Sequence, residues 1–428
     1  MTPILKRFAQ GAMWNTIASI LSRSLNLISI ILVARILGKS GFGEFALIQS
    51  TLATFYIIIS STLTVTTTKH LAEHKNHNKS KANRSLALCL GSAITFGGLA
   101  SFLTGFYSDW ICSTIFETPE IANSVKLASI LIFTNSLNSA MQGILSGLER
   151  FQIIAKQNLL FGILSIFLLP FFAAKYGLQG AIVGQIGTSL AQLAISSRFS
   201  YKSLKAANIK PDWKGIRTEA STYWKFSLPH FSSSVVYSST IWLGYAILSR
   251  EKNGITEIAI FAIGYKWREL ILFIPGSISS VALAMYSERK SSNDANSSKI
   301  IMRSYLMFNC ISGILILMPL AISSSFIIDQ YGHDFSDVSS IPFLITIFSA
   351  FIITLINPYQ NYLVSHNKTW PNLYLTCLWA VSFLVTVKLV EPTLSSTGLA
   401  ITHLTSASVL FIGHLTLHIK FSRNDKSK

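Results

Sequence analysis

The feature that most constrains this chain is the recurrence of apolar segments long enough to cross a lipid bilayer. A membrane-spanning helix needs about 20 mostly apolar residues, and such segments recur along all 428 residues. Only 12% of the residues are charged, whereas soluble proteins average about 25%. The sequence therefore predicts an all-α polytopic membrane protein with about twelve spans. The expected spans are 11–34, 44–67, 86–107, 121–146, 157–174, 178–198, 226–249, 257–286, 305–328, 340–363, 371–390 and 398–419.

The charges between these spans predict the orientation of the chain. Lys and Arg gather in alternate loops, while the other loops are acidic, as in "YSDWICSTIFETPE" and "DQYGHDFSDV". Because basic loops stay on the cytoplasmic side, both termini are expected to be cytoplasmic. The longest inner loop, at 201–225, is expected to link an N-terminal lobe at 1–200 to a C-terminal lobe at 226–428, each with six spans.

A short match between the two halves suggests an internal repeat. "GFGEFAL" at 41–47 and "GITEIAI" at 254–260 share a Gly-x-x-Glu-apolar-Ala-apolar pattern at the outer start of the second span of each half. Two parallel lobes of this kind occur in transporters whose substrate site lies at the midplane of the membrane. Glu44, in the first copy, is a candidate for ion coupling.

Charged residues inside the expected spans are the main functional signal. A charge at the centre of a membrane helix costs around 2.5–3.5 kcal/mol and normally faces a partner or a water-filled cavity. Arg23 is such a residue in the first span. It borders a polar stripe whose spacing of three and four places its members on one helical face. The stripe consists of Asn15, Ser19, Ser22, Asn26 and Ser29.

The eighth span carries three charges in "FAIGYKWRELILFIPG". Lys266 and Glu269 are three residues apart and can neutralise each other, whereas Arg268 points elsewhere and has no obvious partner in its own helix. The fourth span adds Asn135, Asn138 and Gln142 on one face, with Lys126 nearer its outer end. Together these residues predict a net-positive aqueous cavity and an anionic ligand.

A structural role is the alternative interpretation for each of these residues. Arg23 can bond backbone carbonyls at a helix break, and the Lys266–Glu269 pair can simply lock helices together. Lys126 can extend to the interface, and amides can join helices by interhelical hydrogen bonds. The sequence leaves these alternatives open.

Other functional classes find little support in the sequence. The net charge of +17 is spread over short loops, so it does not form the basic face of a nucleic-acid-binding domain. His70, His74 and His77 lie in a basic loop without accompanying ligands, so no metal is expected, and no cofactor motif such as a phosphate-binding loop occurs. His230 follows Pro229 and is a candidate proton carrier, with a structural role as the alternative. Lys6 and Arg7 precede an apolar run that lacks a cleavage site, which indicates a retained first helix.

The N-terminal stretch "GAMWNTIASILSRSLNLISIILVARILGKSGFGEFALIQS" resembles polysaccharide flippases of the Wzx type. The resemblance rests on Trp14, on the pair Leu37-Gly38 and on Phe42-Gly43 before an apolar helix. The Gly-Leu-x-Gly-Ala start of the sixth span, at 177–181, is also similar to that family. These features, with the number of spans, extend the likeness over the whole chain.

The resemblance implies membership of the multidrug/oligosaccharidyl-lipid/polysaccharide (MOP) exporter superfamily, with two six-helix lobes, a V-shaped central cavity and alternating access. It implies a substrate, undecaprenyl-pyrophosphate-linked oligosaccharide, that moves from the inner to the outer leaflet of the bacterial cytoplasmic membrane. Related lipid II flippases hold the pyrophosphate with cations on their first and eighth helices. Arg23, Lys266 and Arg268 lie on those helices here, with Glu269 as charge partner. A cation of the relatives' second helix has no match in "LIQSTLATFYIIISSTLTV".

The resulting hypothesis is an ion-coupled flippase and not an enzyme. Arg23, Lys266 and Arg268 would bind the diphosphate, while Asn15, Ser19, Asn26, Asn135, Asn138, Gln142 and Lys126 would line the glycan cavity. Expected partners are membrane lipids, a polysaccharide polymerase and a chain-length regulator. The rival hypotheses are a multidrug antiporter of the same superfamily, which a positive cavity disfavours, and a membrane-embedded polymerase or glycosyltransferase, which would need larger outer loops.

Overall fold

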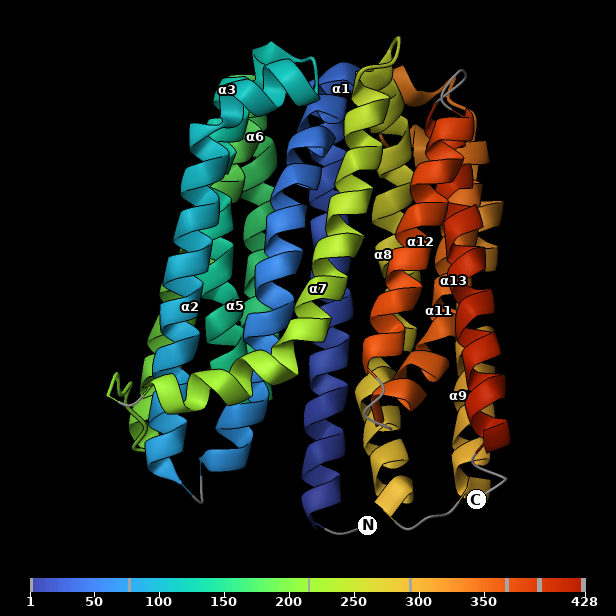
Figure 1. The fold of residues 1–428 in the computed structure, drawn as a ribbon. Coiled ribbons are helices and arrows are strands. Elements are labelled where there is room, and N and C mark those ends of the chain that lie inside the picture. Colours follow the sequence, from blue (N-terminus) through green and yellow to red (C-terminus); the bar gives the residue numbers. More distant parts are fainter. Residues whose placement is uncertain are drawn as a thin grey trace. The chain divides into compact units, whose positions relative to one another are not determined.

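The protein is helical throughout the residues that the structure describes. The computed structural model describes residues 3–75, 78–214, 216–291, 295–365, 369–390 and 395–424; the side chains of some helical residues, including Asn15 and His230, lie outside the description. No strand occurs in these ranges, which confirms the predicted fold class. The long helices (Figure 1) are α1 (Pro3–His74), α2 (Lys79–Phe106), α5 (Ile130–Gly147), α6 (Phe151–Ala206), α7 (Ile216–Ser249), α8 (Gly254–Ser291), α9 (Ala295–Ile322), α11 (Ile341–Ser365), α12 (Thr369–Val390) and α13 (Ser396–Asn424). Short helices are α3 (Ser108–Trp110), η1 (Ile111–Ile115), η2 (Pro119–Ile121), α4 (Ala122–Ala128), α10 (Ser324–Asp329) and η3 (His333–Phe335).

Two of the long helices are broken in the middle by glycine. The backbone of Gly38 in α1 has a φ of 70°, and that of Gly177 in α6 has a φ of 58°. Glycine adopts positive φ without the steric cost that a β-carbon brings, so the chain can reverse at these points. Figure 1 shows the first half of α1 running away from the N-terminus and the second half returning beside it.

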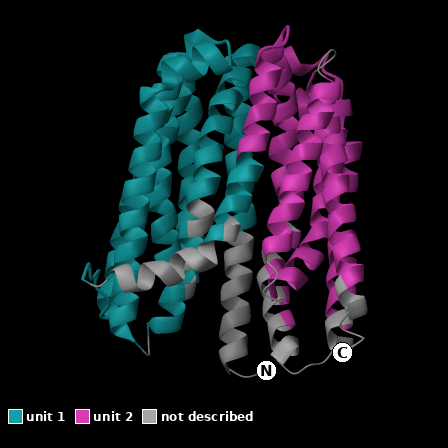
Figure 2. Ribbon diagram, in the orientation of Figure 1, with its two compact units in different colours: residues 1–238 teal, residues 239–428 magenta. Residues whose placement is uncertain are grey.

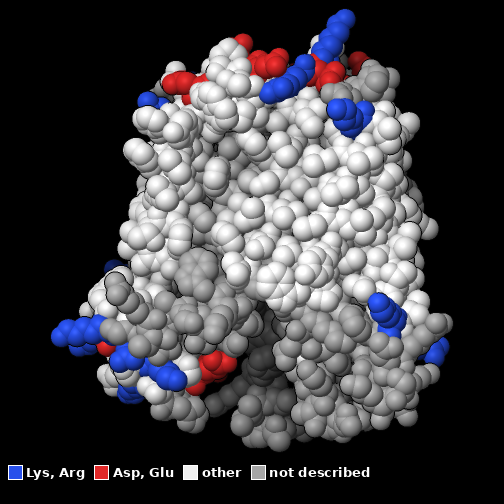
Figure 3. Space-filling model, in the orientation of Figure 1, with Lys and Arg blue, Asp and Glu red and all other residues white. Residues whose placement is uncertain are grey.

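Several helices of the described chain have the length and composition of membrane spans. Seven meet both criteria, and α1 and α6 are among them although each contains a break. The chain is therefore a multi-pass membrane protein, while the count of twelve spans stays a prediction. On the face drawn in Figure 3, Lys, Arg, Asp and Glu lie toward the ends of the helices and leave the middle uncharged.

The chain divides into two compact units, residues 1–238 and 239–428 (Figure 2). The division falls inside α7. The lobe boundaries expected from the loop charges, with a linker at 201–225, stay a prediction.

Inside unit 1, the two halves of α1 pack in parallel register against the two halves of α6. Ser22 Oγ donates to Asn158 O at 2.7 Å and Ser29 Oγ donates to Ser165 O at 2.7 Å. After the glycine breaks, Gln49 Nε2 donates to Gln185 Oε1 at 2.6 Å. All three pairs are 136 residues apart. A constant difference between residue numbers means that the helices run in the same direction, so the two hairpins lie side by side.

Small residues bring α5 close to the second half of α1. Ser139, Gly143 and Gly147 are spaced by four and so share one face of α5. Thr64 Oγ1 donates to Ser139 O at 3.2 Å, and Thr68 Oγ1 donates to Gly143 O at 3.4 Å. Membrane helices use such small residues because lipid provides no hydrophobic force between helices, so close backbone approach must supply the attraction.

Unit 2 is built around α11, which packs on α8, α9 and α13. Asn361 Nδ2 in α11 donates to Ser279 O in α8 at 2.9 Å, and Asn309 Nδ2 in α9 donates to Thr354 O in α11 at 2.7 Å. Glu257, the glutamate of the second repeat copy, accepts from the backbone N–H of Ser396 at 2.7 Å and so caps α13. Amides and a carboxylate inside this unit therefore serve to join its helices.

The acidic connection after α2 is more ordered than a loop. The expected loop at 107–120 folds into α3, η1 and η2, and Cys112 is buried there. Burial, with a smaller contribution from the Asp109 carboxylate, raises the pKa of the Cys112 thiol to about 12. The thiol therefore stays protonated and unreactive at neutral pH.

The close packing of α5 leads to a prediction about stability. A β-carbon at Gly143 would lie 2.9 Å from Thr67 Cβ and 3.2 Å from the backbone oxygen of Thr64. We expect Gly143→Leu to lower the free energy of unfolding by about 1–3 kcal/mol through overpacking, measured as the apparent Tm in detergent. Gly276→Ala is the control, because a β-carbon there meets nothing within 4 Å. Equal Tm values for Gly143→Leu and the control would contradict the packing argument.

The orientation predicted from loop charges can be tested by cysteine labelling in intact cells. Asp337 and Lys202 are exposed residues of the two expected sides. We expect a membrane-impermeant maleimide to label Asp337→Cys from outside and to label Lys202→Cys only after lysis. The unsubstituted chain is the control and sets the background, because it contains the buried Cys112, whose pKa is raised by burial, and the exposed Cys377. The reverse pattern would place both termini outside.

Candidate functional site

Unit 1 contains a polar pocket among its membrane-spanning segments. The pocket has a volume of about 450 Å³ and is bounded by the second half of α1, by α5 and by both halves of α6. Its lining side chains are amides, hydroxyls and one phenol. They are Tyr56, Thr64, Asn135, Asn138, Ser139, Gln142, Asn158 and Gln192.

A hydrogen-bond network centred on Ser189 fixes one wall of the pocket. Ser189 Oγ donates to Thr134 Oγ1 at 2.8 Å and lies 2.9 Å from Asn135 Oδ1. Asn138 Nδ2 donates to Ser189 O at 3.2 Å. These bonds hold the amides of α5 against α6, so their positions are set before any ligand arrives.

The opposite wall is formed where α6 begins its first span. Gln142 Nε2 lies 3.5 Å from Asn158 Oδ1, and the backbone oxygen of Asn158 accepts the hydrogen bond from Ser22. The Tyr56 side chain on α1 is 41% exposed. The pocket therefore combines several amide edges with an accessible aromatic ring.

The chemistry of the pocket suits an uncharged polyhydroxylated ligand. None of its lining residues is charged. Amide and hydroxyl groups both donate and accept hydrogen bonds, as sugar hydroxyls do. The Oδ1 atom of Asn138 is buried and accepts no hydrogen bond from the described residues. Because this atom is buried, the hydrogen-bonding groups that a ligand can reach are those of the other amide and hydroxyl side chains that line the pocket.

The structure brings some of the predicted site residues together and leaves others apart. Asn135, Asn138 and Gln142, expected on one face of the fourth span, all line the pocket. The remaining candidates are not among its lining residues: Ser19 is partly exposed, Asn26 and Lys126 are exposed, and Glu44 is partly buried. The side chains of Asn15 and His230 lie outside the described residues.

Two serines of the polar stripe in the first span contribute to helix packing. Ser22 and Ser29 each donate to a backbone oxygen of α6. Arg23, which borders the stripe, has an exposed side chain in unit 1 and does not line the polar pocket. The two serines thus follow the structural alternative, while Arg23 is accessible to an anion.

The three charges of the eighth span separate into a pair and a buried cation. Lys266 Nζ lies 3.4 Å from Glu269 Oε1, which confirms that these residues neutralise each other. The expectation that Arg268 has no partner in its own helix was wrong. Its guanidinium carbon lies 4.8 Å from the centre of the Tyr265 ring, and its side chain is only 3% exposed. Tyr265 lies almost one turn earlier, so the arginine can fold back over it as a cation–π pair.

An aromatic cluster with a buried histidine surrounds this region of unit 2. The His403 ring of α13 lies 5.3 Å from the ring of Phe261, 5.8 Å from that of Tyr265 and 5.0 Å from that of Phe383, measured between centroids. Tyr265 therefore contacts both His403 and the Arg268 guanidinium. Nothing in the spacing around His403 indicated this role, because its partners come from two other helices, α8 and α12.

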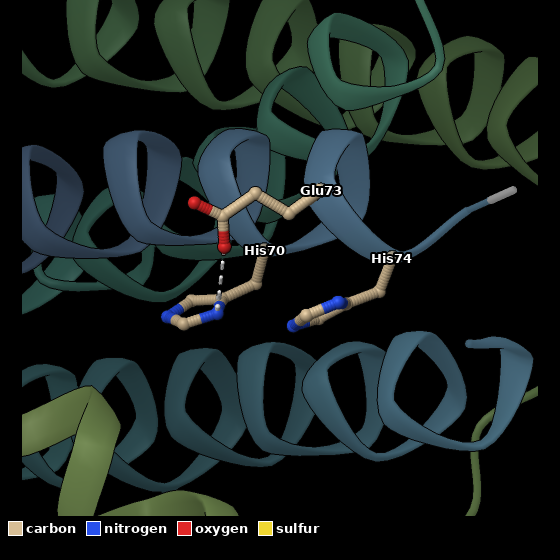
Figure 4. Close-up of side chains that lie close together, drawn as sticks. All are labelled: His70, Glu73 and His74. Atoms are coloured by element: carbon tan, nitrogen blue, oxygen red, sulfur yellow. Dashed lines mark ion pairs between the residues drawn. The ribbon is translucent and has the colours of Figure 1, made fainter. Parts of the chain in front are cut away.

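One group of side chains has the composition of a metal site. Ligand atoms of His70, Glu73 and His74 lie within 4.8 Å of one another near the end of α1 (Figure 4). The sequence suggested histidines without other ligands, and the structure corrects this point because Glu73 lies beside His70, with Oε2 3.9 Å from Nδ1. Zinc ligands at ~2.1 Å from the ion lie closer together than the 4.8 Å over which these atoms spread. We assign no metal to the group.

Five lining residues of the polar pocket escaped the sequence analysis, namely Tyr56, Thr64, Ser139, Asn158 and Gln192. For Gln192 a signal existed, since Gln185, Ser189 and Gln192 are spaced by four and three in an apolar span. No polar stripe through Tyr56 or Asn158 was predicted from the sequence. Only the packing of α1 and α6 against α5 brings them to the pocket.

Solved structures with the same architecture are transporters. The fold superposes on an inward-facing multidrug resistance MATE family transporter of the MOP superfamily with a TM-score of 0.80, at 14% identity, covering 97% of this chain and 99% of that one. It superposes on the lipid II flippase MurJ in an inward-closed conformation with a TM-score of 0.73, at 15% identity. This superposition covers 95% of this chain and 87% of that one. The superposition on the eukaryotic MATE transporter AtDTX14 has a TM-score of 0.75, at 12% identity, and covers 98% of each chain. The fold is thus that of the MOP-superfamily transporters.

Sequence comparison defines the family more narrowly. Residues 8–288 match the profile of the family described as "Polysaccharide biosynthesis protein", and the chain belongs to that family. It is similar to the EPS I polysaccharide export inner membrane protein EpsE of Ralstonia nicotianae, at 20% identity over 50% of this chain and 49% of that protein. The EpsE protein of Ralstonia solanacearum matches at 19% identity over 62% of this chain and 60% of that protein. The similarity therefore spans about half to three fifths of the length of these relatives.

Proposed function

We propose that this protein is a flippase that moves an undecaprenyl-pyrophosphate-linked oligosaccharide from the inner to the outer leaflet of the bacterial cytoplasmic membrane by alternating access. The observation that carries the proposal is the uncharged, amide-lined pocket inside a membrane-spanning unit. A cavity of this chemistry serves a ligand rich in hydroxyl groups. Membership of the polysaccharide family supports the same function, as do the export role and the inner-membrane location of the similar EpsE proteins.

The substrate has three chemically different parts, and each needs a different environment. The glycan would enter the polar pocket, where Asn135, Asn138 and Gln142 exchange hydrogen bonds with its hydroxyls. The face of the Tyr56 ring offers an apolar surface to the C–H groups of a sugar. The polyprenyl tail would stay in the lipid, because burying it in this pocket would leave the amides without partners.

The diphosphate requires cations. The candidate cations differ in burial, so we expect them to act at different stages of binding. Arg23 is exposed, and the Lys266 side chain is 31% exposed beside Glu269, so both can contact a phosphate directly. Arg268 is buried against Tyr265, and we propose that it binds the diphosphate only after its side chain leaves this position. An ion gradient, with a proton as the coupling ion, would reset the carrier, with Glu44 and His230 as candidate coupling groups.

The rival functions would need different residues. An exporter of cationic drugs requires acidic groups in its binding pocket, and the lining of this pocket contains none. A polymerase or glycosyltransferase acting on the same lipid would require catalytic side chains facing a donor sugar. The presence of sugar-nucleotide and glycosyltransferase genes beside this one would favour the flippase over the drug exporter.

The role of the polar pocket can be tested by replacing two of its amides. Gln142→Leu with Gln192→Leu keeps the approximate side-chain volume and removes hydrogen-bonding groups. In a strain that depends on this gene for surface polysaccharide, we expect the polymer to fall by about tenfold, a factor that corresponds to ~1.4 kcal/mol. The measurement is an immunoblot of extracted polysaccharide, with the amount of protein in the membrane determined in parallel. Gln152→Leu is the control, since it removes an exposed amide of α6 outside the pocket. Full polymer from the double variant would exclude the pocket as the glycan site.

The role of the cations can be tested by reversing a single charge. We expect Arg23→Glu to abolish surface polymer and Arg23→Lys to retain most of it, because a phosphate is attracted by either cation. Lys202→Glu, an exposed residue near the end of α6, controls for the loss of positive charge. Normal polymer from the Arg23→Ala and Arg268→Ala double variant would refute the diphosphate-binding role.

A further inference from the structure

A second pocket of unit 1 lies at the end predicted to be cytoplasmic and has a different character from the first. Its volume is about 300 Å³. It lies where α1 and α5 end and where α2 and α6 begin, beside the last turn of α6. Its lining residues are three cations, one hydroxyl and three apolar side chains: Lys75, Lys79, Arg150, Ser203, Leu148, Ala206 and Ala207.

One of the three cations is held in place by its own partners. Lys75 Nζ forms an ion pair with Glu149 Oε1 at 2.5 Å and donates to the backbone oxygen of Gly147 at 3.3 Å. The Lys75 side chain is only 16% exposed, while that of Glu149 is 68% exposed. Lys75 thus neutralises the C-terminal end of α5 and joins α1 to the α5–α6 connection, which makes this wall of the pocket rigid.

The other two cations leave the pocket positively charged. Lys79 and Arg150 are exposed, and within the described parts of the chain no carboxylate lies within ion-pair distance of either. Lys79 is the first residue of α2, and Arg150 immediately precedes α6, whose N-terminus has no side-chain cap. The amino ends of helices carry partial positive charge and bind anions through their backbone N–H groups. The amino end of α6 adds to the charge of these cations, whereas the amino end of α2 is capped by the Asn78 side chain. The carboxyl ends of α1, α5 and α6 carry the opposite partial charge, so the two exposed cations supply the attraction for an anion.

The position of the pocket indicates that the anion is attached to a lipid. Two candidate membrane spans, Lys79–Phe106 and Phe151–Ala206, begin beside it, which places it at the level of the headgroups. Leu148, Ala206 and Ala207 supply an apolar wall, which a free inorganic phosphate would not use but a glycerol backbone would. The cytoplasmic leaflet is enriched in anionic lipids, and basic pockets between membrane helices bind the headgroups of such lipids.

We propose that this pocket binds the phosphodiester headgroup of an anionic membrane phospholipid, with Lys79 and Arg150 as its ligands and the Lys75–Glu149 pair as its fixed wall. The proposal is independent of the glycan pocket and concerns a lipid that is not transported. The bound headgroup would bridge the starts of α2 and α6, which stabilises unit 1.

The test measures lipid binding by the full-length protein. Purified protein in a neutral detergent is titrated with phosphatidylglycerol or phosphatidylcholine, and bound lipid is counted by native mass spectrometry, with the rise in Tm as a second readout. We expect the wild type to prefer phosphatidylglycerol. The double variant Lys79→Gln, Arg150→Gln should bind it at least about tenfold more weakly, because two charge-assisted hydrogen bonds are lost. Lys79→Arg with Arg150→Lys should keep the preference.

The control is the pair Arg198→Gln and Lys202→Gln, which removes the same charge from exposed residues near the carboxyl end of α6 that do not line the pocket. An equal loss of binding in this control would show general attraction to a basic surface and overturn the proposal. Retained preference in the Lys79, Arg150 variant would overturn it as well.

A second arm distinguishes the phospholipid from the proposed substrate, whose diphosphate has similar chemistry. Undecaprenyl diphosphate is added in equal amount to phosphatidylglycerol. If it displaces the phospholipid from the wild type, the pocket belongs to the carrier lipid and our assignment is wrong. If phosphatidylglycerol stays bound, the assignment holds. Surface polymer from the Gln142, Gln192 variant tests the flippase function separately, so the failure of one proposal does not imply failure of the other.

Discussion

The close approach of helix backbones inside each unit is the constraint on which the rest of the structure depends. A bilayer supplies neither water for backbone groups nor a hydrophobic force between helices. Unit 1 meets this condition with Ser139, Gly143 and Gly147 on α5, against which threonines of α1 donate directly to backbone oxygens. A larger residue at these positions would push α5 away from α1, and the polar pocket between them would lose its shape.

The same residue types serve as helix contacts and as a binding surface, and their partners decide which role they take. Ser22 and Ser29 bond to backbone oxygens of α6 and are satisfied there. Asn138 donates to Ser189 O, yet its Oδ1 atom receives no hydrogen bond from the described residues. A polar network that is complete adds stability, whereas a buried acceptor without a donor reduces it.

How much of the site could be predicted depended on whether its residues share a helix. The amide face of α5 and the Lys266–Glu269 pair follow from the helical repeat, and the structure confirms that each group lies together. The position of the Arg268 side chain was harder to predict. Its spacing of three from Tyr265 does not reveal whether the guanidinium turns toward that ring or toward solvent. Tyr56 and Asn158 were not predicted, since they lie on different helices from the amides of α5 and only the packing of these helices brings them to the same pocket.

The sequence by itself determined that the chain crosses the membrane several times as helices, that its basic loops alternate with acidic ones, and that it belongs among the polysaccharide biosynthesis proteins. The tertiary structure alone decided that α1 pairs with α6 in parallel register, that Arg268 is buried, and that Lys75, Lys79 and Arg150 meet at one pocket. The physical reason is that helical periodicity defines which residues share a face. The helix that this face meets depends on contacts between segments that lie far apart in the chain.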